Sequence, residues 1–164
     1  MHEIFLEDAM ASETNLKNLL KDPSLLVTQG YLAGEWVDGE DGATFDVTNP
    51  ARGDVIAQVA DLSRAQTAQA IAAAETAQKE WAAKTAKERA NILRRWYDLM
   101  MENADDLGTI LTAEQGKPLA EAKGEIGYGA SFIEFFAEEA KRIYGETIPG
   151  HQPDKRITVL KQPI

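Results

Sequence analysis

The stretch from residue 63 to residue 145 repeats its apolar residues with a helical period, which limits the fold more than any other feature. Two capping boxes, in which paired side chains bind the free amides at a helix start, lie at Ser63/Gln66 and Thr85/Glu88. We expect Asn103 to cap a third helix and Pro118 to open a fourth, since proline suits a first helical turn. Gly145 is expected to end this fourth helix as a C′ glycine.

The spacing of apolar residues predicts which face of each helix is buried. For the first helix this face is Ile71, Ala74, Gln78 and Trp81, and for the second it is Ala90, Leu93, Tyr97 and Met100. For the fourth helix the face is Ile126, Gly129, Ala130, Ile133, Phe136, Ala137, Ala140 and Ile143. Three aromatic residues fall off that last face, namely Tyr128, Phe132 and Phe135.

The remaining segments indicate short strands. Residues 31–33, 36–37, 45–47 and 55–59 have strand character and are separated by turn residues, with Gly34-Glu35 as the first turn. Residues 156–164 alternate polar and apolar positions without a partner strand nearby, so we expect an unpaired strand that belongs to a larger protein. Residues 1–29 are interpreted as a peripheral arm. A helical bundle with a β appendage and one part of an α/β enzyme both fit this order.

The composition argues against several classes of function. The chain has 17 basic and 27 acidic residues and a formal charge of −10, which disfavours nucleic acid and anionic membrane surfaces as partners. It contains no cysteine, so it has neither a disulfide framework nor a cysteine-based zinc site. Its apolar runs are too short for a membrane span, and its first residues are acidic where a signal peptide is basic. These features predict a cytoplasmic protein.

The residues alone predict no catalytic, cofactor-binding or metal-binding site. The two histidines, His2 and His151, have no partners at metal-ligand or triad spacing. The glycines of the Gly127–Gly129 segment lie within a helical pattern, where they favour close helix packing over a phosphate-binding loop. A cluster of positive charge is interpreted as a solvated face or as the complement of an acidic neighbouring helix or subunit: Lys84, Lys87, Arg89, Arg94 and Arg95.

Several motifs, in order, resemble the N-terminal part of aldehyde dehydrogenases, and among them the succinate-semialdehyde dehydrogenase branch. The strongest are Glu114–Leu119, Glu125–Tyr128 and Phe135–Glu146. Shorter matches occur at Gly34–Val37, Asn49–Gly53, Ala82–Arg89 and Leu160–Ile164. The resemblance covers the chain from about Gly30 to its end and leaves residues 1–29 unassigned.

The resemblance implies an α/β parent fold in which this stretch is mainly α-helical, with short N-terminal strands and a C-terminal strand. Residues 30–146 would form the N-terminal helical portion of the coenzyme-binding domain. Residues 147–164 would begin a β extension, truncated here, through which family members oligomerise. A homo-oligomer formed through residues 155–164 is the partner that this placement implies.

The resemblance also implies an activity, the NAD- or NADP-dependent oxidation of succinic semialdehyde to succinate by covalent catalysis. In the family the catalytic cysteine, the general-base glutamate and the cofactor-binding residues come later in the chain. We therefore expect this chain to be inactive alone and to bind no cofactor. Tyr128 and Phe132 would line the aldehyde tunnel, or alternatively fill the helix–helix core. Glu114 falls where some relatives bind a structural monovalent cation, but a surface carboxylate is the alternative.

Two other functions remain open from the sequence. The chain could be a standalone helical interaction or oligomerisation module derived from such an enzyme. It could also be one half of a split enzyme whose catalytic half is a separate chain.

Overall fold

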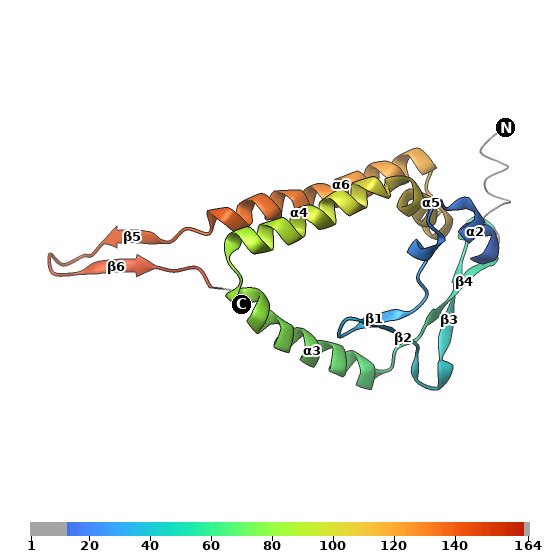
Figure 1. Cartoon of the computed structure of the whole chain (residues 1–164), viewed down its shortest axis with the longest axis horizontal. Coiled ribbons are helices and arrows are strands. Elements are labelled where there is room, and N and C mark those ends of the chain that lie inside the picture. The colour runs from blue at the N-terminus through green and yellow to red at the C-terminus, as the bar shows by residue number, and fades with distance from the viewer. Residues whose placement is uncertain (1–12, 163–164) are drawn as a thin grey trace.

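The computed structural model describes residues 13–162 and has the outline of an open ring with a projecting hairpin (Figure 1). Its helices are α2 (Glu13–Leu19), α3 (Arg64–Ala83), α4 (Ala86–Glu102), α5 (Ala104–Gln115) and α6 (Leu119–Glu139). The strands are β1 (Gly30–Leu32), β2 (Glu35–Val37), β3 (Thr44–Thr48), β4 (Val55–Ala60), β5 (Glu146–Pro149) and β6 (Arg156–Val159). Helices α4 and α6 lie side by side along one edge of the ring, and α3 lies along the other.

The three sheets in residues 13–162 are antiparallel hairpins of consecutive strands: β1 with β2, β3 with β4, and β5 with β6. The expected unpaired C-terminal strand was wrong, because Arg156–Val159 pairs with Glu146–Pro149, a strand that the sequence pattern did not reveal. The predicted position of the first turn, Gly34-Glu35, was also wrong by one residue. The turn consists of Ala33 and Gly34, both with positive φ, as a tight hairpin turn requires.

The two predicted capping boxes are confirmed. The Ser63 hydroxyl accepts the amide of Gln66 at 3.1 Å, and the Thr85 hydroxyl accepts that of Glu88 at 3.3 Å. We had expected Asn103 to cap α5, but its side chain makes no capping hydrogen bond there. Its Nδ2 atom instead donates to the carbonyl of Leu99, so the side chain ends α4 rather than starting α5.

The predicted end of the last helix at Gly145 was wrong. Helix α6 ends at Glu139 and continues as a short 3₁₀ turn over Ala140–Arg142. Gly145 has no left-handed φ, and a Cβ atom there would collide with the backbone carbonyl of Val159. Glycine is therefore required at this position by the close approach of the β6 backbone, not by a helix cap.

A small core joins α2, β4 and α5. Its centre is Leu16, only 1% exposed, which packs with Ile56 and Ala113. Leu16 thus lies inside the fold, although it belongs to residues 1–29, which the sequence indicated as a peripheral arm. Contacts of this kind join segments far apart in sequence, and local patterns carry no signal for them.

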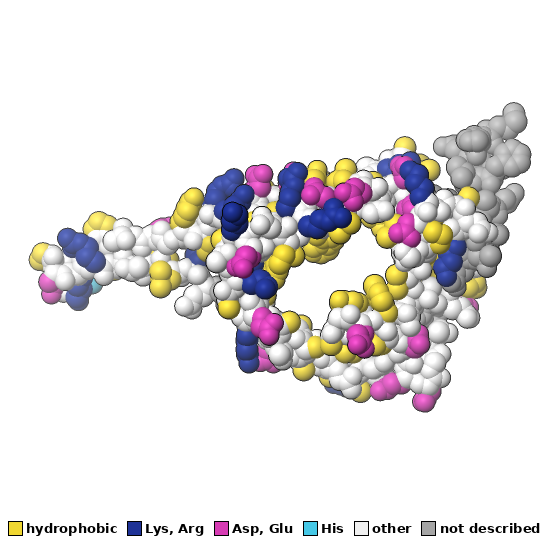
Figure 2. Space-filling view, in the orientation of Figure 1, with side chains coloured by type: hydrophobic (Ala, Val, Ile, Leu, Met, Phe, Trp, Pro, Cys, Tyr) yellow, Lys and Arg dark blue, Asp and Glu magenta, His cyan; other side chains and the backbone are white. Residues whose placement is uncertain are grey.

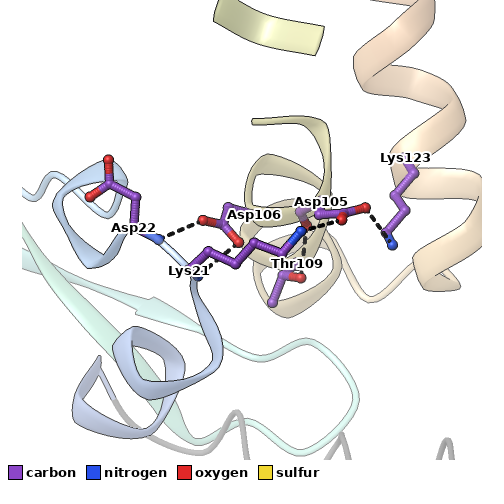
Figure 3. Close-up of polar contacts among 6 residues, drawn as sticks. All are labelled: Lys21, Asp22, Asp105, Asp106, Thr109 and Lys123. Carbon is purple, nitrogen blue, oxygen red and sulfur yellow. Dashed lines mark hydrogen bonds and ion pairs between the residues drawn. The ribbon is translucent and has the colours of Figure 1, made fainter. Parts of the chain in front are cut away.

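The carboxylate of Asp106 binds the N-terminal arm, of which residues 13–29 are described, to α5 (Figure 3). It is only 5% exposed and accepts the backbone amides of Lys21 at 3.0 Å and Asp22 at 2.8 Å. A buried carboxylate needs such donors, since desolvation would otherwise destabilise it strongly. Two amides that follow α2 are thereby satisfied in one contact.

The predicted buried faces hold where helices pack on each other and fail elsewhere. In α4 the face is right, with Ala90 buried and Leu93, Tyr97 and Met100 half-buried. In α6, Ala130 and Ala137 are buried, but Gly129 and Phe136 are exposed, contrary to expectation, and so is Ile143, which follows the 3₁₀ turn after α6. Helix α3 contains no buried residue, so its predicted face at Ile71 has no cover in the described chain.

The accessible surface is large because so few residues are covered. It amounts to 11630 Å², whereas a compact protein of this mass exposes about 8,000 Å². Figure 2 shows the cause, an opening through the ring with hydrophobic side chains along its rim. The fold thus carries helices whose second apolar side faces open space.

We had expected the glycines of α6 to allow close helix packing, but they do not. A Cβ atom added at Gly124, Gly127 or Gly129 would meet no atom within 4 Å. In α5 the situation is the opposite, since a Cβ at Gly108 would lie 2.7 Å from the Lys123 side chain of α6. The close approach between helices is therefore at Gly108.

Substitution by alanine should have opposite effects on stability at the uncrowded glycines of α6 and at the crowded Gly108 of α5. Gly129→Ala should raise the free energy of unfolding by about 1 kcal/mol, because alanine favours a helix interior and meets no neighbour. Gly108→Ala should lower it, because α5 and α6 must separate. Urea unfolding followed by circular dichroism measures both, and equal stabilisation by the two variants would contradict this packing.

Removing the Asp106 carboxylate tests the attachment of the arm. Asp106→Ala leaves two amides without an acceptor and should lower the free energy of unfolding by about 3 kcal/mol. The neighbouring variant Asp105→Ala should have a much smaller effect, because that side chain is exposed. The same urea experiment separates them, and similar losses would show that Asp106 has no special role.

Candidate functional site

The two residues predicted to line a tunnel, Tyr128 and Phe132, lie together on an exposed side of α6. Their ring centroids are 4.9 Å apart in an edge-to-face arrangement. Tyr128 is 66% exposed and Phe132 is 48% exposed. Both rings are therefore exposed among the described residues, and the tunnel and core roles remain predictions for the whole protein.

Local sequence explains this placement. Residues four apart share one side of a helix, so the two rings meet there. The opposite side of α6 carries buried Ala122, Ala130 and Ala137, whose small side chains let α6 approach its neighbours. The aromatic pair thus lies on one side of α6, and the opposite side packs against the neighbouring helices.

Ion pairs also hold α6 in position. Arg94 of α4 binds Glu134 of α6 at 2.8 Å and Asp98 of its own helix at 3.4 Å. For Arg94, an acidic neighbouring helix was therefore the right interpretation of the cationic cluster. Arg95 instead pairs with Glu102 within α4.

A second group of charges links α6 to α5 and the arm (Figure 3). The Asp105 carboxylate binds Lys123 of α6 at 2.8 Å and Lys21 of the arm at 2.7 Å. Hydrogen bonds from Lys123 and then Lys21 lower the pKa of Asp105 to about 2. The same contact raises the pKa of Lys21. No local sequence pattern pointed to this cluster, because its members come from three separate segments.

Glu114 lies at the edge of an apolar groove of about 260 Å³. The groove is lined mainly by aliphatic side chains of the arm, the β3–β4 hairpin and α5, such as Leu26, Val47 and Ile110. Glu114 itself is exposed, as its interpretation as a surface carboxylate predicted. Within residues 13–162 no cluster of three or more acidic, histidine or cysteine side chains is placed to hold a metal ion.

A larger cavity of about 510 Å³ lies where the end of α3, the start of α4 and the segment after β6 meet. Trp81, Arg89, Ile143 and Lys161 are among its lining residues. The Arg89 guanidinium donates to the backbone carbonyls of Ala82 and Lys84. Its role is therefore to hold the turn between α3 and α4.

No catalytic constellation emerges among the described residues. His151 is exposed in the loop between β5 and β6, and His2 lies outside the described residues. Among the helices that the structure describes, none is both long and apolar enough to cross a bilayer.

Residues 36–164 match a sequence model described as the aldehyde dehydrogenase family. The chain belongs to this family. It is 63% identical over 88% of its length to a glutarate-semialdehyde dehydrogenase of Pseudomonas aeruginosa. It is 59% identical, over the same share, to an NADP-dependent succinate-semialdehyde dehydrogenase of Escherichia coli. In both cases it spans 30% of the relative's length.

Solved structures of the family have the same arrangement. An aldehyde dehydrogenase from Brucella melitensis biovar abortus matches with a TM-score of 0.85 and 60% identity, covering 88% of this chain and 30% of that one. The mainly helical part of an α/β parent, expected from the resemblance, is therefore confirmed as an aldehyde dehydrogenase fold.

The Asp105 cluster predicts how stability depends on pH. A carboxyl group whose pKa falls from 3.8 to about 2 on folding stabilises the fold above its unfolded value. This contribution is lost as pH falls through the folded value. The difference in urea midpoint between the unmodified chain and Asp105→Asn should be constant from about pH 6 to about pH 4. It should then shrink towards about pH 2, and a difference that persists there would contradict the prediction.

Proposed function

We propose that this chain is the N-terminal, helical portion of an NAD(P)-dependent aldehyde dehydrogenase that oxidises succinic semialdehyde to succinate. The observation that carries the proposal is the 59–63% identity to succinate- and glutarate-semialdehyde dehydrogenases. Both names describe short aldehydes that end in a carboxylate, which supports this substrate class for the whole enzyme. The location that we propose for the whole enzyme is the cytoplasm.

The chemistry of this reaction requires groups that the chain does not contain. A cysteine thiolate adds to the aldehyde carbon, hydride leaves that carbon, and water hydrolyses the resulting thioester to the acid. NAD or NADP supplies the hydride acceptor when bound. The chain has no cysteine, so we expect it to turn over no aldehyde by itself and to bind neither cofactor.

Tyr128 and Phe132 have a role in this proposal that suits their position. They form an aromatic, uncharged wall on a helix that is held from behind by α4 and α5. Such a wall can guide the carbon chain of an aldehyde without binding its carboxylate. Their exposure in this chain leaves them accessible to a substrate path.

The β5–β6 hairpin is the proposed oligomer contact, from about residue 155 onward. All eight residues of the two strands are exposed, including Ile148, Ile157 and Val159. Each strand also has one edge without a partner in the described chain. Exposed edges with apolar side chains favour strand addition by a second subunit.

Activity assays test the central part of the proposal. This chain replaces the matching segment of the Pseudomonas aeruginosa relative, and the hybrid is assayed with succinic and glutaric semialdehydes and either cofactor. We expect the hybrid to reduce NAD or NADP with these substrates and the 164-residue chain alone to show no turnover. Activity of the chain alone, or an inactive folded hybrid, would overturn the proposal.

The tunnel role is tested in the same hybrid by Phe132→Ala. The Michaelis constant for the aldehyde should rise about five- to ten-fold with little change in kcat, since the wall contacts substrate before and during reaction. Phe136→Ala is the matched control, because Phe136 is also exposed but its ring contacts Phe135 and not Tyr128. An unchanged Michaelis constant together with lower stability would show that Phe132 is only a packing residue.

A further inference from the structure

The connection between β2 and β3 contains two aspartate–glycine steps, Asp38-Gly39 and Asp41-Gly42. This dipeptide has a particular chemistry, because glycine places no side chain beside the amide nitrogen that follows the aspartate. That nitrogen can attack the side-chain carboxyl carbon of the aspartate and close a five-membered succinimide ring. Since the two steps are identical dipeptides close together in the sequence, a difference in their reactivity would come from the fold.

The fold holds the first step from several sides. The side-chain amides of Gln29 and Gln66 donate to the carboxylate and to the backbone carbonyl of Asp38, both at 2.8 Å. Gly39 is buried, and a Cβ atom there would collide with the backbone carbonyl of Ala43. Closure of a ring at this step requires these contacts to open together, because the glycine nitrogen must rotate towards the aspartate side chain.

The second step is held by its own turn. Asp41 and Gly42 are both exposed, in the short 3₁₀ turn Glu40–Gly42. No described residue forms a hydrogen bond or an ion pair with the Asp41 carboxylate, and a Cβ atom at Gly42 would meet no atom within 4 Å. The Gly42 amide donates to the Gly39 carbonyl at 3.0 Å, so opening of this one turn releases the nitrogen.

The backbone conformation of the second step also favours opening. Asp41 has a left-handed conformation with φ 56° and ψ 21°, and Gly42 follows with φ 71°. A residue with a Cβ atom adopts such a conformation only at a steric cost, which opening of the turn removes. Segments with few contacts and exposed hydrogen bonds are those that open most often in a folded protein.

We propose that Asp41 is a modification site at which isoaspartate forms in the folded chain, whereas the fold protects Asp38. The Gly42 nitrogen forms a bond to the side-chain carboxyl carbon of Asp41, and the carboxyl hydroxyl leaves with the amide proton as water. Water then adds to the main-chain carbonyl carbon of the ring, and the bond from that carbon to nitrogen breaks. The chain afterwards continues through the Asp41 side chain. One water is released and one is consumed, so the reaction needs no other reactant and does not depend on the proposed function.

Heavy-oxygen water detects this reaction, since each succinimide that hydrolyses leaves one heavy oxygen at its aspartate. The 164-residue chain is incubated at mildly acidic pH, both folded and unfolded in urea, and a protease that cuts after Glu40 separates the two steps for mass spectrometry. In the folded chain the label at Asp41 should exceed that at Asp38 by at least about ten-fold, because only the second step opens readily. In urea the two labels should agree within about two-fold, since the contacts that distinguish the two steps are lost. Equal labels in the folded chain, or a label at Asp41 in urea alone, would overturn the proposal.

Two variants test the assignment. Gln66→Glu keeps an acceptor oxygen for the α3 capping box but has no amide to donate to Asp38. The label at Asp38 should therefore rise at least about three-fold, with that at Asp41 unchanged, because one contact that resists opening is gone. An unchanged label at Asp38 would contradict the protection by the fold.

Asp41→Glu is the blocking variant, because glutamate would have to close a six-membered ring, which forms far more slowly. The folded variant should lose the label at position 41. It should also cease to be a substrate there for an enzyme that methylates isoaspartate. A label that persists at position 41 in this variant would come from other chemistry and would refute the proposal.

Discussion

The structure depends on one constraint, the small apolar core that this chain can form by itself. Leu16, Ile56 and Ala113 are its centre, and only small side chains are fully covered between α5 and α6. Burial of apolar area is the main favourable term in folding, so each additional element must be held by local means. The capping boxes and the three hairpins are such means, and the Asp106 attachment adds a polar contact between distant segments. They define the backbone but leave large apolar faces open.

This constraint connects the fold with the proposed function. The core beneath the arm fixes α5, and the contact at Gly108 and the Asp105–Lys123 pair then place α6 against it. Because α6 is held from that side, its Tyr128–Phe132 face is presented outward in a defined position. A wall for a substrate path requires a rigid helix with an uncovered face, and this packing supplies it.

Features that depend on neighbours in sequence could be predicted, and features that depend on distant segments could not. The capping boxes at Ser63 and Thr85 were right because both partners lie within one turn. The phase of the α6 stripe separated Tyr128 and Phe132 from the buried Ala130 and Ala137, but it also placed Phe136 in the core, where it is not. The burial of Leu16, the role of Asp106 and the pairing of β6 were missed, since each joins segments whose contact leaves no periodic signal. Family membership was readable because short motifs kept their order along the chain.

The heat capacity change on unfolding tests most directly whether the chain lacks a full core of its own. This quantity scales with the apolar area that unfolding exposes, and a compact domain of this length gives about 2 kcal/mol/K. Calorimetry of the isolated chain at a concentration where it is monomeric should give a clearly smaller value. A value of about 2 kcal/mol/K or more would mean that the apolar faces are already covered, and would contradict the account.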